Sequence, residues 1–384
     1  MANSFAPKAS PPATRRLIID GRRLTAARTG VGRYLETLLR DWSATGWPLD
    51  ETVVVLQHPE GVARLPRDAR LRVEVVGARL PGLAWEWLGL GRVLKPGDVL
   101  FAPTNLLPIH WRGTSVLIVF DTLLESVPES FPRTVRWRFR SRYRLSARRA
   151  TRVIVPSEAT ARDVVRHYGV DPSRVRTIYP AIGHEFRPRS PEDGMIVAAR
   201  WAVGVGEAPY FLFVGKRSRR RNVGAVVDGF TRHYERFPSH RLVFAGPAGG
   251  VEVPAHPAIV VAGHVTDDVL LGLMAGAVAC LYPSDHEGFG LPLVEAMASG
   301  CPVVTLRNSA LVESGGDAAV YLERAEAGEI ATAIGRLAED HSLSEALVGS
   351  GLGQARKFRG SGFAEAVREE IRSAAGLVPA APGG

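Results

Sequence analysis

The chain has 384 residues, which is enough for two domains of ordinary size. Its content of 46% hydrophobic and 23% charged residues is that of a globular protein and excludes disorder over the whole length. A formal net charge of +9 favours anionic partners, such as nucleotide phosphates, anionic lipid or nucleic acid.

Two end segments, residues 1–14 and 376–384, are rich in Ala, Pro, Ser or Gly, and we expect them to be disordered. The N-terminus lacks the apolar core of a signal peptide, and the longest uncharged stretch, 269–284, is shorter than the ~20 residues of a membrane-spanning helix. We therefore expect a cytoplasmic protein, with peripheral attachment at the inner membrane face left open. Cys280 and Cys301 lie in apolar surroundings, which indicates inert core thiols.

Short runs rich in Val, Ile and Leu alternate with amphipathic stretches, and this predicts parallel sheets covered by helices on both faces. In the first half, strands are expected at residues 17–20, 53–56, 73–76, 99–102, 116–120 and 153–155, and helices at 31–42 and 157–167. In the second half, strands are expected at 210–214, 242–245, 259–262, 279–282, 302–305 and 319–322, and helices at 223–237, 266–277, 292–299 and 328–339.

This pattern predicts an α/β protein of two doubly wound, Rossmann-like domains that face a cleft. Their expected limits are 15–190 and 209–375, joined by a linker with some local structure over 191–208. In such sheets ligands bind outside the carboxyl ends of the strands. A substrate bound between the two domains is therefore expected.

A first candidate motif is the glycine turn TGVGR at residues 29–33, at the start of a predicted helix. Gly30 and Gly32 would let the backbone approach a ligand, and helix-terminal N–H groups favour an anion, although an ordinary turn is the alternative. The dinucleotide-binding fingerprint is incomplete because Leu35 replaces its third glycine, and the next strand ends in Gln57-His58 instead of an acid. Both departures argue against a dehydrogenase.

A second candidate is the loop 215–222, which begins at Gly215 and carries five Lys or Arg residues after a predicted strand. Cations at the carboxyl end of a strand and the start of a helix are suited to a diphosphate. A solvated basic loop is the alternative. The spacing of a P-loop is absent.

The third candidate is the segment 287–295, EGFGLPLVE. Pro292 suits the first turn of a helix, which places Glu295 in or near that turn, where the helix dipole favours a carboxylate. Gly288 and Gly290 would expose N–H groups beside Glu287. The two acids and these glycines would form a sugar-sized polar site, and two unrelated surface acids are the alternative.

The segment 282–304, YPSDHEGFGLPLVEAMASGCPVV, resembles the signature of the family-four retaining glycosyltransferases of the GT-B fold. The mark of that family is two Glu residues separated by seven others, as Glu287 and Glu295 are. The resemblance extends to residues 29–39, 155–182 and 210–222, and thus covers most of the chain.

The resemblance implies an acceptor-side N-terminal domain and a C-terminal domain that binds a nucleotide-sugar. Glu287 would face the transferred sugar, Glu295 would hold the donor ribose, and Arg220 with Arg221 would hold the diphosphate. Asp121 is implied as a second catalytic residue. The other donor-binding residues implied are Gly30, Gly32, Gly215, Gly288, Phe289, Gly290 and Leu291.

Two residues depart from the family pattern. Arg221 stands where Lys is usual, which keeps the charge and changes its geometry. Phe120 stands where the family often has the His of a His-Asp pair. Phe120 either offers an apolar contact that favours a 6-deoxy sugar, or packs in the core while another group serves the 6-hydroxyl.

The resemblance implies transfer of a hexose or deoxyhexose from a nucleotide-sugar to a saccharide or lipid-linked acceptor, with retention of anomeric configuration. No cofactor is expected, since the nucleotide-sugar is a substrate, and no metal is expected, since the D-x-D motif is absent. Alternatives are a nucleotide-sugar epimerase or hydrolase on the same scaffold, or a basic membrane- or nucleic-acid-binding protein. The donor base, the sugar, the acceptor and the oligomeric state stay open.

The segment 133–152 carries nine Arg residues interleaved with Trp137, Phe139 and Tyr143. On a helix, basic and aromatic residues indicate an anionic membrane surface, and a solvated face with aromatics in the core is the alternative. No nucleic-acid-binding module surrounds the segment, so we expect no nucleic-acid partner. The residues that would form one basic stripe, four apart, are Arg136, Arg140, Arg144 and Arg148.

Overall fold

The computed structural model describes residues 15–25, 30–360 and 362–378. The first segment expected to be disordered, 1–14, lies outside the described residues, as do residues 379–384 of the second expected segment, 376–384. Thr29 of the glycine turn also lies outside the described residues. The described chain divides into two compact units. The first holds the residues up to Ile118, Arg149–Val153 and those from Ala364, and the second holds Val119–Arg148 and Ile154–Phe363.

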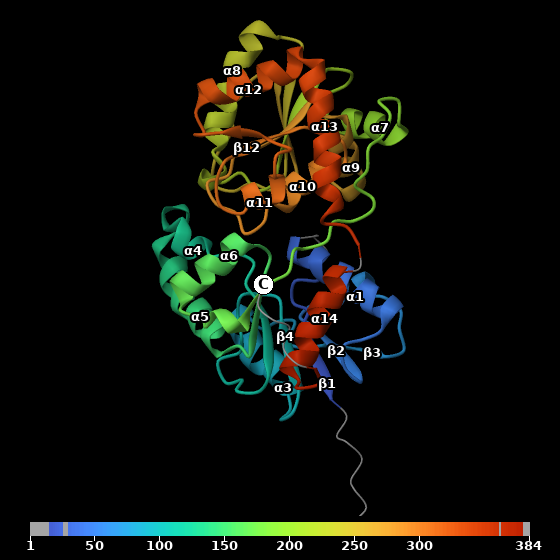
Figure 1. Cartoon of the computed structure of the whole chain (residues 1–384), viewed down its shortest axis with the longest axis vertical. Helices are drawn as coiled ribbons and strands as arrows, with labels where there is room; N and C mark the ends of the chain where they lie inside the picture. The colour runs from blue at the N-terminus through green and yellow to red at the C-terminus, as the bar shows by residue number, and fades with distance from the viewer. Residues whose placement is uncertain (1–14, 26–29, 361, 379–384) are drawn as a thin grey trace, which may run out of the picture. The chain divides into compact units, whose positions relative to one another are not determined.

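A seven-stranded sheet has the order β3-β2-β1-β4-β5-β6-β7. Its strands β1 to β4 are labelled in Figure 1. Its strands are β1 (Arg16–Asp20), β2 (Glu51–Leu56), β3 (Leu71–Val75), β4 (Val99–Ala102), β5 (Ser115–Ile118), β6 (Arg152–Val155) and β7 (Val175–Thr177). The α-helices are α1 (Gly30–Thr45), α2 (Gly82–Ala84), α3 (Gly91–Val93), α4 (Leu123–Ser126), α5 (Arg133–Arg149) and α6 (Glu158–Asp163). Short 3-10 or π segments are η1 (Pro59–Arg64), η2 (Trp85–Leu90), η3 (Pro128–Ser130), η4 (Val164–Tyr168) and η5 (Pro172–Arg174).

A six-stranded sheet has the order β10-β9-β8-β11-β12-β13. Its strands are β8 (Tyr210–Val214), β9 (Arg241–Ala245), β10 (Ile259–Gly263), β11 (Ala279–Tyr282), β12 (Val303–Leu306) and β13 (Val320–Leu322). The helices are α7 (Gly194–Ala202), α8 (Val223–Arg236), α9 (Asp267–Gly276), α10 (Leu291–Ala298), α11 (Leu311–Gly315), α12 (Ala327–Glu339) and α13 (His341–Arg356), with the 3-10 turn η6 (Arg219–Arg221). The prediction of two parallel, doubly wound sheets is confirmed.

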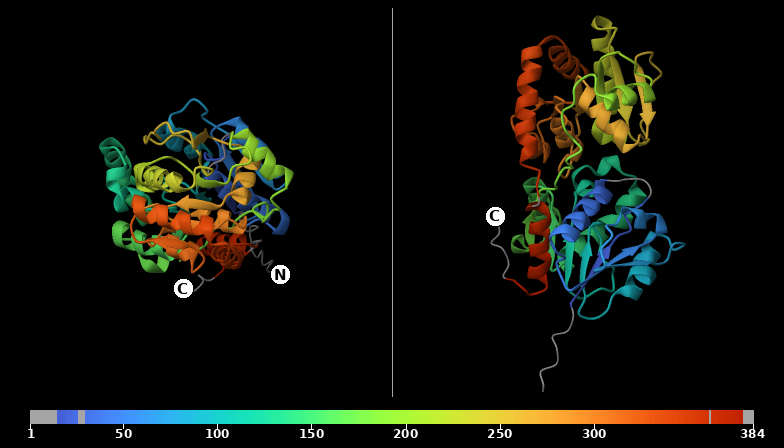
Figure 2. Two further views of the ribbon diagram at one scale, coloured as in Figure 1. Left: turned by 90° about the horizontal axis from the view of Figure 1, so that it is seen from above. Right: turned by 90° about the vertical axis from the view of Figure 1, so that its right-hand side faces the viewer.

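The strand β8 shows why its sequence YFLFV is apolar at every position. Successive side chains of a strand point to opposite faces, and here both faces are covered. Phe211 and Phe213 pack with α8 and α12, whereas Leu212 and Val214 pack into the core on the other face, with α9 and α10. Figure 2 shows helices on both sides of this sheet.

The order of the second sheet positions the candidate site. The chain runs outward from β8 to β9 and β10, then returns to place β11 on the other side of β8. This reversal makes the carboxyl ends of β8 and β11 a topological switch point, where α/β sheets bind their ligands. The loops 215–222 and 283–290, which carry the predicted cations and the first predicted acid, leave these two strand ends.

Two of the helices that were not predicted from the sequence bear on the domain limits. The segment 191–208, expected to be a linker with some local structure, contains α7. This helix packs so closely on α9 that a Cβ at Gly272 would lie 2.4 Å from the Met195 carbonyl oxygen. The last helix, α14 (Gly362–Ala374), packs in the first unit, where Trp42 Nε1 donates to the Ala364 carbonyl at 2.9 Å. The two compact units therefore differ from the predicted domain limits.

Cys280 and Cys301 are free and buried, as expected of core thiols. Burial raises the pKa of Cys280 to about 12 and raises that of Cys301 as well, so both thiols are protonated at neutral pH. Among the described helices, none combines the length and the apolar character needed to span a membrane.

Candidate active site

In the loop after β8, the side chain of Arg221 folds back over Gly215, the first residue of the loop. Gly215 has φ +116°, a conformation that favours glycine, and a Cβ there would lie 1.8 Å from Arg221 Nη1, so a larger residue would displace the guanidinium. The turn η6 then ends at Asn222, which has φ +51° and precedes α8. Gly215 therefore serves the site by making room for Arg221.

Asn222 connects this loop to the loop after β11. Its Nδ2 donates to the Pro283 carbonyl at 3.0 Å and to Asp285 Oδ1 at 2.7 Å. The Asp285 N–H donates in turn to the Arg220 carbonyl at 2.8 Å. These bonds fix the basic loop against the segment that carries Glu287.

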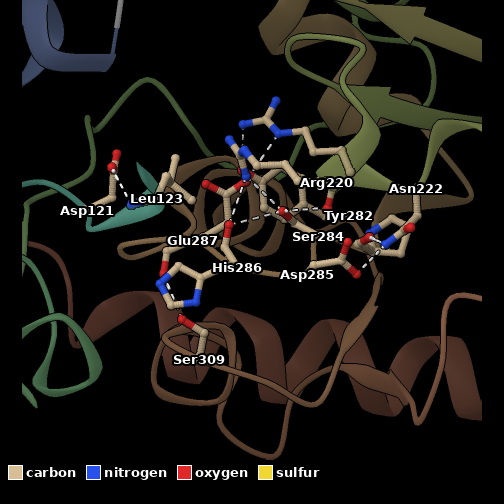
Figure 3. A network of polar contacts seen from close by, with 12 residues as sticks. Asp121, Leu123, Arg220, Asn222, Tyr282, Ser284, Asp285, His286, Glu287 and Ser309 are labelled. Atoms are coloured by element: carbon tan, nitrogen blue, oxygen red, sulfur yellow. Dashed lines mark hydrogen bonds and ion pairs between the residues drawn. The ribbon is translucent and has the colours of Figure 1, made fainter. Parts of the chain in front are cut away.

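Glu287 is the centre of the polar network in Figure 3, where Arg220 and Tyr282 point toward it. Its Oε1 accepts from Arg220 Nη1 at 2.5 Å, from Arg221 Nε at 3.1 Å and from the Tyr282 hydroxyl at 2.8 Å. Arg221 Nη2 also donates to the Tyr282 hydroxyl at 3.0 Å. The residues predicted to hold a diphosphate are thus paired with the acid predicted to face the sugar.

Glu287 is only 8% exposed, and its ionisation depends on these partners. Burial by itself would raise the pKa of Glu287, but the charges of Arg221 and Arg220 and the hydrogen bonds outweigh it and lower that pKa to about 2. The same carboxylate helps to raise the pKa of Arg221 against the opposing effect of burial. Glu287 and Arg221 are therefore both charged at neutral pH.

Asp121 is brought to this network by a close backbone approach. A Cβ at Gly288 would lie 1.7 Å from the Phe120 carbonyl oxygen and 3.2 Å from the Asp121 Cβ, so Gly288 has to be glycine. Asp121 Oδ1 accepts from the Leu123 N–H at 3.2 Å. Burial raises the pKa of Asp121, an effect that the Leu123 hydrogen bond and the Arg220 charge reduce and the Glu287 charge increases.

The segment after Glu287 forms the start of α10. Gly290 has φ +94° and precedes the helix, which begins at Leu291. Glu295 is the fifth residue of α10 and so lies in its second turn, close to the expected position, and it is 3% exposed. The Phe289 side chain is buried and packs on the rings of Tyr179 and Phe358, with centroid distances of 6.0 and 5.0 Å. The Phe289 side chain therefore has a packing role, and its predicted part in donor binding stays a prediction.

Other predicted residues stand apart from this network. Gly30 and Gly32 belong to α1 of the first unit, so their role toward a donor stays a prediction. The helix α5 confirms that the basic segment is helical. The arginines of the predicted stripe form contacts within the protein, but the side chains of Arg140 and Arg144 remain 52% and 40% exposed. Arg140 and Arg144 pair with the buried carboxylate of Glu125, and Arg148 Nε donates to the Tyr168 carbonyl at 2.5 Å.

The helix α5 also exposes apolar side chains near the predicted stripe. Trp137 is 87% exposed and Leu145 is 46% exposed. Arg133 and Arg138 are also exposed. Glu125, near in space, pairs with two of the four arginines of the predicted stripe, and helical spacing cannot reveal such pairing. That the stripe contacts an anionic membrane stays a prediction.

Several residues of the site were missed in the sequence. Tyr282 ends β11, so its position at a strand's carboxyl end was a usable signal. The Ser309 hydroxyl donates to the Glu287 carbonyl at 2.9 Å, and Asn308 Nδ2 donates to the Ser284 carbonyl at 3.1 Å. No local pattern marks these two, because they reach the site from the loop after β12.

Two sequence families match the chain. A model described as Glycosyltransferase Family 4 matches residues 28–186, and one described as Glycosyl transferases group 1 matches residues 208–340. Together they take in more than half of the chain, including the loops of the network above. The chain belongs to the family-four glycosyltransferases.

Curated relatives of this glycosyltransferase are named for different transfer reactions. The chain is 27% identical over 276 residues to O-antigen chain mannosyltransferase B of Escherichia coli, covering 68% of this chain and 71% of that protein. It is 30% identical over 218 residues to D-inositol 3-phosphate glycosyltransferase 2 of Catenulispora acidiphila, covering 51% of this chain and 50% of that protein. The chain thus spans about half of the second relative.

A solved structure shares the fold over almost the whole chain. The structure of Anabaena Alr3699/HepE in complex with UDP-glucose superposes with a TM-score of 0.74 at 18% identity, covering 94% of this chain and 99% of that one. This likeness establishes the GT-B fold for the glycosyltransferase described here.

Proposed function

We propose that this glycosyltransferase moves a hexosyl or deoxyhexosyl group from a nucleotide-sugar to a saccharide or lipid-linked acceptor, with retention of anomeric configuration. One observation carries the proposal: two guanidinium groups converge on the carboxylate of Glu287 at the switch point of the second sheet. A sugar diphosphate needs such cations at the phosphates and an acid at the sugar. The UDP-glucose bound to the Anabaena structure and the mannosyltransferase name of the E. coli relative support it.

We propose that donor binding rearranges the ion pairs of Glu287 with Arg220 and Arg221. The β-phosphate of the donor takes the N–H groups of Arg220 and Arg221, and the Glu287 carboxylate is released toward the sugar. The arginines then stabilise the charge that develops on the leaving diphosphate, since they are held in place before the reaction. The N–H groups at the start of α10, from Gly290 and Leu291, would add dipoles of the same sign.

A panel of nucleotide-sugars tests the proposed function. The correct donor, at about 100 times its Kd, should stabilise the fold by about 2.7 kcal/mol, which is measurable as a rise in Tm. Radiolabelled sugar should then appear on an added saccharide or lipid-linked acceptor, and NMR of the product should show a retained anomeric configuration. Release of free sugar that is unaffected by any acceptor would contradict transfer and indicate a hydrolase.

Because of Phe120, the donor sugar in this proposal is either a 6-deoxy sugar or a sugar with a 6-hydroxyl. Its backbone carbonyl contacts Gly288, which follows Glu287, so the residue lies close to the network. A matched pair of donors that differ only at the sixth carbon, compared by kcat/KM, distinguishes an apolar contact at Phe120 from plain packing.

We expect transfer to proceed without added divalent metal. Arg220 and Arg221 already supply two positive charges where the diphosphate would bind, so the leaving group has counter-charges in the protein itself. Initial rates should therefore agree within about twofold with and without 5 mM EDTA, the scale of a negligible barrier change. A rate abolished by EDTA and restored by magnesium or manganese would contradict this expectation.

We also propose that the exposed face of α5 binds anionic membrane, where a lipid-linked acceptor would be found. Trp137 and Leu145 supply apolar contact, and Arg133 with Arg138 supplies charge worth about 1 kcal/mol per residue near an anionic surface. The triple variant Arg133→Gln, Trp137→Ala, Arg138→Gln should lose most co-sedimentation with phosphatidylglycerol vesicles at low salt.

The matched control for this experiment replaces another exposed tryptophan and two exposed arginines, Trp201→Ala with Arg236→Gln and Arg324→Gln. That control should bind vesicles like the wild type. Equal binding by the triple variant and the wild type would remove the membrane proposal.

A further inference from the structure

The carboxylate of Asp163 contacts the two segments that carry the candidate catalytic acids. Its Oδ2 accepts from the Thr122 hydroxyl at 3.2 Å, and the same oxygen lies 3.2 Å from His286 Nε2. Thr122 directly follows Asp121, and His286 directly precedes Glu287. One oxygen atom thus bridges the neighbours of both acids.

These contacts are sheltered from solvent, which makes them effective restraints. Thr122 is fully buried, and its hydroxyl also lies 2.9 Å from the Ser126 hydroxyl. The side chain of His286 is 14% exposed, and that of Asp163 is 21% exposed. A second histidine, His167, lies 4.0 Å away from the other oxygen, Oδ1. The hydrogen bond with His286 holds the pKa of Asp163 below its usual value despite the opposing effect of burial.

The helix that ends at Asp163 also holds the other side of Glu287. At its beginning, the hydroxyls of Ser157 and Thr160 donate to the Gly288 carbonyl at 2.7 and 3.0 Å. The beginning of α6 therefore bonds to residue 288, and its last residue, Asp163, contacts residue 286. Glu287, between them, has little freedom to move relative to α6.

We infer that Asp163 is a positioning residue of the transfer reaction, which fixes the spacing of Asp121 and Glu287 through Thr122 and His286. The inference rests on the proposed function, because it needs both acids to act on one substrate. Asp163 acts on the neighbours of these acids and supplies no group to the Arg–Glu cluster. Its loss should therefore misplace the reacting geometry while nucleotide binding is kept.

Asp163→Asn tests this role because it keeps the shape and removes the charge. The kcat should fall about tenfold to a hundredfold, as expected for a displacement of catalytic groups by a fraction of an ångström to one ångström. The Kd for the nucleoside diphosphate, measured by calorimetry, should stay within about threefold of the wild type, because Arg220 and Arg221 are intact. The matched control Asp228→Asn, at an exposed acid of α8, should leave both quantities unchanged.

A double-mutant cycle separates positioning from a general loss of stability. If Asp163 acts through His286, the two substitutions remove the same contact. The kcat of the double variant Asp163→Asn/His286→Gln should then be no lower than the kcat of whichever single variant is slower. Losses that multiply would overturn the inference. Should Asp163→Asn fail to fold, Thr122→Val removes the hydroxyl at similar shape, and a wild-type kcat in that variant would also overturn it.

The outcome for Asp163 is distinguishable from that for the proposed function. A wild type that transfers sugar, with Asp163→Asn equal to it in kcat, overturns the inference and leaves the function standing. If the wild type transfers sugar from no donor, the proposed function is overturned. Hydrogen exchange then tests the contact of Asp163 with Thr122 and His286. Faster exchange at the amides of residues 284–290 in Asp163→Asn supports the restraint, and unchanged exchange overturns it.

Discussion

Glu287→Gln is expected to lower kcat by more than about a hundredfold, the scale seen when a preorganised electrostatic group is removed from an active site. The variant keeps the size of the side chain and loses its charge, and the charge is fully present at neutral pH because the pKa of Glu287 is about 2. Nucleoside diphosphate should bind at least as tightly as to the wild type. The physical reason is that the carboxylate no longer competes with phosphate for Arg220 and Arg221.

In Glu287→Gln, kcat should fall while the affinity for nucleoside diphosphate stays the same or rises, so loss of folding cannot explain the result. Turnover with the identified donor and calorimetry with UDP and GDP should be measured on the same preparation. Asp228→Asn is the matched control, since Asp228 is an exposed acid of α8 outside this network. Turnover near the wild-type value in Glu287→Gln, with the control also active, would refute the catalytic assignment.

The same ion pairs make a prediction for stability against pH. The folded-state pKa of Glu287 is depressed from its ordinary value of 4.5 to about 2. The stabilisation it provides is therefore fully present above pH ~4.5 and is lost as the pH falls toward 2. In Glu287→Gln this part of the acid sensitivity should be absent, which urea unfolding between pH 3 and pH 6, monitored by circular dichroism, would reveal.

Arg221→Ala and Arg220→Ala should each weaken the binding of nucleoside diphosphate roughly tenfold to a hundredfold. A charge-assisted hydrogen bond is worth about 1.5–3 kcal/mol, and each guanidinium is positioned by contacts within the protein. Arg221 lies over Gly215 and over the Tyr282 ring, with its Cζ 5.1 Å from the ring centroid, so it is already held for binding. Arg221→Lys keeps the charge and loses the planar fork, and its affinity should be intermediate.

Arg219→Ala is the control for these two variants, because Arg219 belongs to the same basic loop and is exposed. Calorimetry at fixed ionic strength should show a change of less than about threefold for this control. If all three alanine variants lose affinity equally, the loop acts through its overall charge and the specific diphosphate site is wrong. If none does, the phosphates bind elsewhere.

Family signatures locate residues more reliably than they describe contacts. Phe289 was placed in the donor site by its position in the signature, and its side chain packs on Tyr179 and Phe358. Gly288 was expected to expose an N–H group, and the structure shows in addition that the Phe120 carbonyl leaves no space for a Cβ. Both positions are constrained by packing as well as by the substrate.

The sequence by itself determined the two parallel sheets, the basic loop after β8 and the position of Glu287 before a helix. Each of these follows from a local pattern: apolar runs such as YFLFV, cations clustered after a strand, and glycines with Pro292 at a helix start. Local patterns of this kind survive folding because a parallel strand buried on both faces has to be apolar along its whole length.

Only the tertiary structure decided which charges meet. Arg220 and Glu287 are 67 residues apart in the chain and pair because β8 and β11 are neighbours in the sheet. In the same way, Glu125 pairs with Arg140 and Arg144 of the expected basic stripe, and Asp163 contacts Thr122 and His286. Spacing along the chain carries no information on such pairs, because strand order, which sets the distances between distant loops, is decided when the whole sheet is assembled.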